Sequence, residues 1–171
     1  FVLSRNHLNN ESIKYKDNIE EKQNLLQNYK SEEIETKFRF ENTVRNNGWK
    51  INFGTGIEAV TYKNKTYQKI IFQNIEDTLN FNSELNFIKS SFFGQISKKL
   101  INNKIVASLG IRTDQNSYSK QMANPLKQLS PRFSLAYALN EKNSLNFNMG
   151  QYFQLTAYTV MGYRNSSNEL I

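Results

Sequence analysis

The chain contains no cysteine and a single histidine, His7, in 171 residues. The first absence excludes disulfides and thiolate metal sites, and the second argues against a histidine metal site or a Ser-His-Asp triad. No nucleophile, base and orienting group can be assembled into an active site, so we expect a protein that is not an enzyme and holds no cofactor or metal. No stretch approaches the roughly 18 consecutive apolar residues that a membrane-spanning helix requires.

Charge is in excess of one sign, with a net charge of +7. The lysines are spread along the chain and do not gather on one face, as contact with a nucleic-acid backbone would require. We therefore expect no nucleic-acid binding. Hydrophobic residues make up only 38% of the chain, yet aromatic residues reach 13%. Strands that alternate apolar and polar residues would produce this combination.

Alternation with a period of two is clearest in residues 49–59. One set of alternate residues is apolar or small: Trp49, Ile51, Phe53, Thr55, Ile57 and Ala59. The intervening set is polar or small: Lys50, Asn52, Gly54, Gly56 and Glu58. Because successive side chains of a strand point to opposite faces, the pattern predicts a two-faced strand, long enough to cross a bilayer at a tilt.

The same alternation recurs and predicts about seven strands, in residues 1–5, 34–44, 49–59, 80–100, 105–113, 133–139 and 145–149. In residues 80–100 the apolar parity changes, since Leu85 and Phe87 are odd-numbered whereas Phe92, Ile96 and Leu100 are even-numbered. A β-bulge near residues 89–91 would restore a single apolar face. The expected fold is all-β, an antiparallel up-and-down meander that forms an open segment of a transmembrane β-barrel.

The expected connections alternate in length. Short, asparagine-rich turns are expected at residues 46–48, 102–103 and 140–143, and long polar connections at residues 7–31, 63–78 and 116–128. Asn and Gly tolerate the positive φ of tight hairpins. Outer-membrane barrels combine short periplasmic turns with longer extracellular loops, so the two edges are assigned accordingly. Residues 20–29 have a helix-forming composition and are alternatively a short helix within the first loop.

The polar face of such a barrel would line the lumen or contact a plug domain. The residues expected there are Lys50, Asn52, Glu58, Arg112, Asp114, Asn146 and Asn148. The charged side chains among them alternatively only pair across strands. Small residues on this face, such as Gly54, Gly56 and Gly110, would leave room for something packed inside.

Aromatic residues near the strand ends suggest the belts that mark membrane interfaces. Trp49 directly follows a short turn, where the periplasmic belt would lie. The residues expected in the opposite, extracellular belt are Tyr62, Tyr118, Tyr152 and Phe153, together with Tyr67, Tyr158 and Tyr163. Alternatively, these rings pack in the core of a soluble β protein.

Three segments occur in an order that resembles the barrel of TonB-dependent outer-membrane receptors of the Bacteroidota type. They are Gly110-Ile111-Arg112-Thr113-Asp114, Ser130-Pro131-Arg132-Phe133-Ser134-Leu135-Ala136-Tyr137 and Gly150-Gln151-Tyr152-Phe153-Gln154. The resemblance implies a 22-stranded barrel in the outer membrane of a Gram-negative bacterium, with an N-terminal plug, energised by TonB. Such receptors import scarce nutrients: siderophore-bound iron, a vitamin, glycans or peptides.

In this interpretation residues 1–171 are one partial barrel domain, and the plug, the TonB-contacting part and the remaining strands are absent. The expected partners are outer-membrane lipid and lipopolysaccharide, the plug and other strands of the parent protein, TonB and the imported nutrient. Two alternatives stay open. One is the wall of an outer-membrane barrel without TonB coupling, such as a porin or adhesin, and the other is a soluble β-rich binding module.

Overall fold

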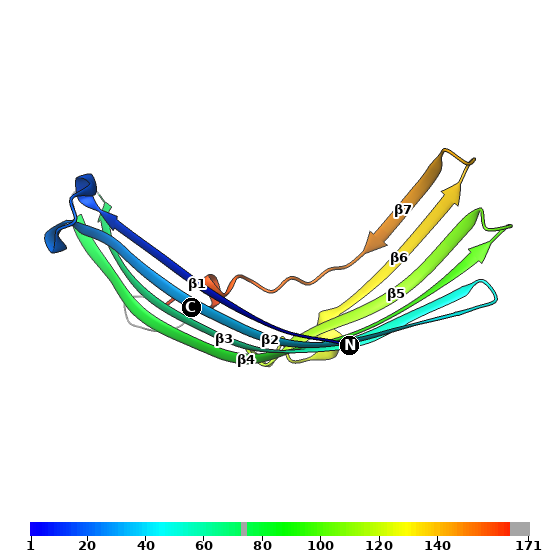
Figure 1. Ribbon diagram of the computed structural model, residues 1–171, viewed down its shortest axis with the longest axis horizontal. Coiled ribbons are helices and arrows are strands. Elements are labelled where there is room, and N and C mark those ends of the chain that lie inside the picture. Colours follow the sequence, from blue (N-terminus) through cyan, green and yellow to red (C-terminus); the bar gives the residue numbers. More distant parts are fainter. Residues whose placement is uncertain (73–74, 165–171) are drawn as a thin grey trace. The chain divides into compact units, whose positions relative to one another are not determined.

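Seven strands form one sheet in the computed structural model, which describes residues 1–72 and 75–164. Figure 1 shows the strands following one another across the sheet in chain order. They are β1 (Val2–Tyr15), β2 (Leu25–Asn46), β3 (Trp49–Phe72), β4 (Ile75–Leu100), β5 (Ile105–Asn116), β6 (Leu129–Ala138) and β7 (Ser144–Gly150). The expected all-β fold, an open antiparallel meander of seven strands, is confirmed.

Helical structure is limited to single turns. These are the 3-10 turns η1 (Lys16–Asn18), η2 (Lys22–Asn24) and η3 (Pro125–Gln128) and the α-helical turn α1 (Tyr158–Met161). Across the described ranges, no helix has the length and apolar character needed to cross a membrane.

Several strands are longer than the sequence pattern predicted. The first connection contains only residues 16–24, since β1 continues to Tyr15 and β2 begins at Leu25. The predictions of long loops at residues 7–31 and 63–78 are therefore both wrong, the second because β3 extends to Phe72 and β4 starts at Ile75. The alternative helix over residues 20–29 is replaced by one 3-10 turn and the start of β2. Only the third long connection, residues 117–128, matches the expectation.

The short turns form where asparagine and glycine were expected to form them. Asn47 and Gly48 join β2 to β3 with φ values of 47° and 75°, the left-handed pair that a two-residue type I′ hairpin requires. The β4–β5 turn holds Ile101, Asn102 and Asn103 at positive φ. In a β-branched residue such as Ile101, this backbone conformation is strained.

The chain divides into two compact units. Unit 1 consists of Phe1–Ser4, Lys37–Glu58 and Ile88–Gln154, and unit 2 consists of Arg5–Thr36, Ala59–Phe87 and Leu155–Ile171. Strands β2, β3 and β4 therefore each contribute one end to each unit.

In unit 1 the pairing of β4 to β7 sets complete cross-strand rows. Ser97 of β4 lies opposite Ser108 of β5, which lies opposite Ser134 of β6, which in turn lies opposite Asn148 of β7. Rows of this kind place alternate residues of neighbouring strands on a common face.

Unit 2 has an apolar core on one face of its strands. Val60 and Tyr62 of β3 and Phe81, Leu85 and Phe87 of β4 are buried there. The C-terminal segment covers them, because Tyr158 packs its ring against those of Tyr62 and Phe87, with centroids 5.9 Å and 5.6 Å apart. Met161 is buried in the same core.

The bulge expected near residues 89–91 is absent. Thr61 of β3 donates a hydrogen bond to Asn86 of β4, and nearer the hairpin turn the amide of Lys99 donates to the carbonyl of Gly48. In an antiparallel pair the numbers of opposite residues keep a constant total unless a residue is inserted in one strand. The two contacts have the same total, so β3 and β4 stay in one register between them. The parity change instead separates the two units: odd-numbered apolar residues of β4 are buried in unit 2, and even-numbered ones are exposed in unit 1.

Candidate functional site

One face of unit 1 exposes almost only apolar side chains, and we call it the apolar face. Its large exposed members are Phe38, Val44, Trp49, Ile51, Phe53, Ile57, Ile88, Phe92, Ile96, Leu100, Leu109, Ile111, Leu135, Tyr137, Leu145, Phe147 and Met149. They are the even-numbered residues of β2 and β4 and the odd-numbered residues of β3, β5, β6 and β7 in this unit. No large hydrophobic residue of these strand segments is exposed on the opposite face.

The size of this face is energetically significant. Its members are about half exposed, as Ile57 is at 53% and Phe147 at 55%. Burying the exposed half of each side chain would lower the free energy by roughly 1 kcal/mol, and by on the order of 15 kcal/mol for the whole face. That sum is comparable with the entire folding free energy of an ordinary domain. A contiguous apolar surface of this extent indicates a contact with something apolar.

An amphipathic cluster marks the apolar face beside the β2–β3 turn. The ammonium group of Lys98 lies 4.5 Å from the centroid of the Trp49 ring. The same ammonium donates a hydrogen bond to the carbonyl oxygen of Asn47, at 3.0 Å. A tryptophan and a lysine in contact at the end of an apolar surface are typical of a membrane interface.

The opposite face of unit 1, the polar face, carries all seven residues that the sequence pattern assigned to the lumen. Glu58 forms ion pairs with Lys37 of β2 and Lys89 of β4. Arg112 donates two hydrogen bonds of 2.6 Å to the carboxylate of Asp114, two residues further along the same strand. Glu58 thus pairs across strands, as one of the alternatives expected, whereas Arg112 and Asp114 pair along one strand.

The uncharged lumen candidates lie in rows with other polar groups. Asn52 accepts a hydrogen bond of 3.1 Å from the Thr43 hydroxyl. Asn146 donates to Ser144 at 3.4 Å. Asn148 is exposed, as is the charged candidate Lys50.

The space expected above the glycines of the polar face is partly filled from within the sheet. A Cβ atom on Gly54 would lie 2.6 Å from the Phe93 ring and would also meet the carbonyl oxygen of Phe40. At Gly56 it would lie 2.9 Å from the hydroxyl of Ser91. At these two positions neighbouring atoms fill the space, whereas a Cβ atom on Gly110 would have only ordinary contacts, the nearest at 3.6 Å.

The expected interface aromatics do not share one location. Tyr62 is a core residue of unit 2, only 2% exposed, because the C-terminal segment folds over it. Its hydroxyl accepts a hydrogen bond from Asn64, and burial raises the pKa of Tyr62 above its ordinary value. Tyr152 stacks with Arg132, whose guanidinium carbon lies 4.6 Å from the ring centroid, and this puts Tyr152 against the polar face.

The remaining two aromatics of that set lie outside the strands. Tyr118 lies in the β5–β6 connection and is partly exposed, with its backbone amide bonded to the Asn116 side chain. Phe153 follows β7 and is 39% exposed. Trp49 alone among the five lies on the apolar face. The ring that packs on Tyr62, that of Tyr158, is far away in the sequence. Local alternation therefore could not show whether Tyr62 lies in a core or in a membrane-interface belt.

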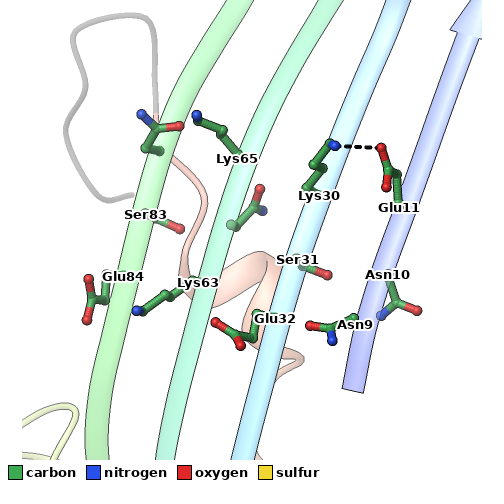
Figure 2. A pocket seen from close by; sticks show the side chains of 12 residues that line it. Asn9, Asn10, Glu11, Lys30, Ser31, Glu32, Lys63, Lys65, Ser83 and Glu84 are labelled. Atoms are coloured by element: carbon green, nitrogen blue, oxygen red, sulfur yellow. Dashed lines mark ion pairs between the residues drawn. The ribbon is translucent and has the colours of Figure 1, made fainter. Parts of the chain in front are cut away.

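Unit 2 carries a charged face on the side of the sheet away from its core. Figure 2 shows Lys63 of β3 lying between Glu84 of β4 and Glu32 of β2, with the α1 turn behind the strands. In the neighbouring row the ammonium of Lys30 pairs with the carboxylate of Glu11 at 2.7 Å. Water is the natural environment of this face, because charged groups of both signs alternate across it.

In the part of the chain that the structure describes, no three His, Cys, Asp or Glu residues are grouped so as to hold a metal ion. Comparisons with protein-family models, with curated proteins and with solved structures find no match to this chain.

Proposed function

We propose that this chain forms part of the wall of a transmembrane β-barrel, with the apolar face of unit 1 in contact with lipid. The observation that carries the proposal is the segregation of exposed apolar side chains to one face of unit 1. The other face holds ion pairs and hydrogen-bonded polar groups. Transmembrane barrels alternate in this way because each strand separates hydrocarbon from a polar interior.

Strand segments in unit 1 have the length that a bilayer requires. The β3 segment of unit 1 runs over residues 49–58 and that of β5 over Ile105–Asn116, close to the 9–11 residues of a tilted spanning strand. The odd-numbered residues of β3 include Ile51 and Ile57 before residue 58, but Lys63 and Lys65 after it. We therefore expect the spanning part of β3 to end before these lysines.

Within this class, we propose a TonB-dependent outer-membrane receptor that imports a scarce nutrient. Support comes from the ordered motifs at Gly110–Asp114, Ser130–Tyr137 and Gly150–Gln154. Open edges support a barrel of either kind, since β1 and β7 each have one edge without a neighbour among the described strands, and a barrel must close such edges with further strands. The polar face would then face the plug and the permeation path.

Site-directed spin labelling tests the lipid contact directly, because the chain has no native cysteine. Single variants Ile57→Cys and Phe147→Cys would be reconstituted in phospholipid vesicles and labelled. We expect both labels to collide more readily with dissolved oxygen, which concentrates in lipid, than with a water-soluble nickel complex.

Two matched variants serve as controls. Asn148→Cys is the neighbour of Phe147 on the opposite face, and Lys63→Cys has the same strand and parity as Ile57. Both labels should favour the nickel complex. Equal accessibility at residues 147 and 148, or a monomeric chain that remains in the aqueous phase without detergent, would refute the membrane wall and favour a soluble module.

The receptor proposal has its own test. In the bacterium that produces this protein, loss of TonB and loss of this protein should abolish uptake of the same nutrient. Uptake that persists without TonB would leave the barrel in place but reassign it to an uncoupled porin-like or adhesin-like wall.

A further inference from the structure

Three basic residues gather on the polar face of unit 1, beside the β2–β3 turn. Arg45, Lys50 and Lys99 line a groove with a volume of about 530 Å³. They come from three neighbouring strands, β2, β3 and β4. No aspartate or glutamate lines this groove.

Two of these cations are held directly opposite each other. The two-residue turn at Asn47 and Gly48 pairs Asn46 with Trp49, and so it places Arg45 opposite Lys50. The hydrogen bond from Thr43 to Asn52 has the same register. Like charges in a directly opposed pair destabilise a sheet, so an anion that neutralises them would stabilise this hairpin.

On β2 to β5 the other strand charges of the polar face have ion-pair partners, and Arg132 of β6 stacks on the ring of Tyr152. Glu58 pairs with Lys37 and Lys89, and Arg39 pairs with Glu41. Arg112 pairs with Asp114. Within the described ranges, Arg45, Lys50 and Lys99 have no carboxylate within ion-pairing distance. Lys98, the fourth cation that lines the groove, donates to the carbonyl oxygen of Asn47. The unpaired positive charge of this face is therefore concentrated at the turn.

A hydroxyl donor completes the groove. Ser97 of β4 and Ser108 of β5 both line it. The Ser97 oxygen accepts hydrogen bonds from the Ser108 hydroxyl, at 2.8 Å, and from the Gln95 side-chain amide, at 3.4 Å. Because both bonds use Ser97 as the acceptor, its own hydroxyl proton remains to be donated to a ligand.

We propose that this groove binds an oxyanion of the phosphate type. The Arg45 guanidinium, the Lys50 and Lys99 ammonium groups and the Ser97 hydroxyl supply the charge-assisted donors that a multiply charged tetrahedral anion needs. The phosphate belongs either to a free solute or to a phospholipid headgroup. All the residues that line the groove belong to unit 1, so the site does not depend on the membrane assignment.

Trp49 is the only tryptophan of the chain and also lines the groove, so its fluorescence reports on binding. The full chain would be refolded in maltoside micelles, which contain no phosphate, and titrated with inorganic phosphate at constant ionic strength. We expect a saturable change. The double variant Arg45→Gln/Lys50→Gln should weaken apparent affinity by about tenfold or more.

Lys142→Gln is the matched control, since it removes one positive charge from the exposed β6–β7 connection. It should leave the titration unchanged. Arg45→Lys retains the charge and should retain most of the binding, and far-UV circular dichroism verifies that each variant is folded.

A parallel titration with phosphatidylglycerol in the micelles distinguishes the two sources. A response to inorganic phosphate that the double variant loses supports a free oxyanion. A response to the lipid alone, again lost in the double variant, assigns the same chemistry to a headgroup. The absence of a saturable response to either probe, or an equal loss in Lys142→Gln, would overturn the proposal.

Discussion

Replacement of Gly54 by alanine should destabilise unit 1 although the substitution adds one methyl group. That methyl would lie 2.6 Å and 2.8 Å from two carbons of the Phe93 ring, whereas carbon atoms in contact prefer about 3.5–4.0 Å. The ring could rotate away, but the methyl would also meet the backbone carbonyl of Phe40. This carbonyl cannot move without disturbing the β2–β3 pairing.

Overpacking of this kind costs about 1–3 kcal/mol, and the fixed carbonyl places Gly54→Ala near 2 kcal/mol. Urea unfolding of the chain in detergent micelles, followed by circular dichroism, measures the cost. With a slope of about 2 kcal/mol per molar urea, the midpoint should fall by roughly 1 M.

Gly94→Ala is the control, because a Cβ atom there would have no atom within 4 Å. It should be neutral or slightly stabilising, since alanine restricts the unfolded chain. The double variant Gly54→Ala/Phe93→Ala should still be destabilised, since the clash with Phe40 persists. Equal midpoints for Gly54→Ala and Gly94→Ala would refute the reasoning.

Three further predictions concern hydrogen bonds and protons. Tyr158→Phe removes a 2.6 Å donor to the buried Glu35 carboxylate, so unit 2 should lose about 1–3 kcal/mol and its C-terminal segment should be cleaved faster in limited proteolysis. Ser108→Ala removes the donor to Ser97 and should lower the free energy of unfolding by about 1 kcal/mol, measured in urea. Burial raises the pKa of Tyr62 in the folded state, so its contribution to stability is complete below about pH 10 and declines above it, as the unfolded tyrosine releases its proton first. Tyr62→Phe should flatten the fall in urea midpoint between about pH 10 and 12, and an unchanged fall would contradict this assignment.

The sheet and its short turns were predictable because their signals are local. Alternation at residues 49–59 and the asparagine-rich turns depend on neighbours two to four residues apart. The extension of β3 through Lys63, Asn64 and Lys65 was not predictable in the same way. Both parities are polar there, and burial of Asn64 depends on hydrogen bonds to Tyr62 and Thr66, so the segment has the composition of a loop.

For the candidate sites, too, only the features that depend on local sequence could be predicted. Residues of the polar face could be assigned from parity alone, and the structure pairs Glu58, Arg112 and Asp114 with neighbouring charges. The location of Tyr62 depended on Tyr158, almost a hundred residues away, and the filling of Gly54 depended on Phe93 from another strand. Long-range contacts of this kind leave no periodic trace in a single sequence.

The parity change in β4 between Phe87 and Ile88 has a consequence for assembly. The two ends of β4 suit different solvents. In unit 2 its odd-numbered apolar side chains are buried under the C-terminal segment, whereas in unit 1 its even-numbered apolar side chains are exposed. In a bilayer, the wall could enter only until the charged rows of Lys63 and Glu84 reached the headgroups, since charges resist transfer into hydrocarbon. In the proposed membrane wall, this change of parity would therefore limit how deeply the sheet inserts.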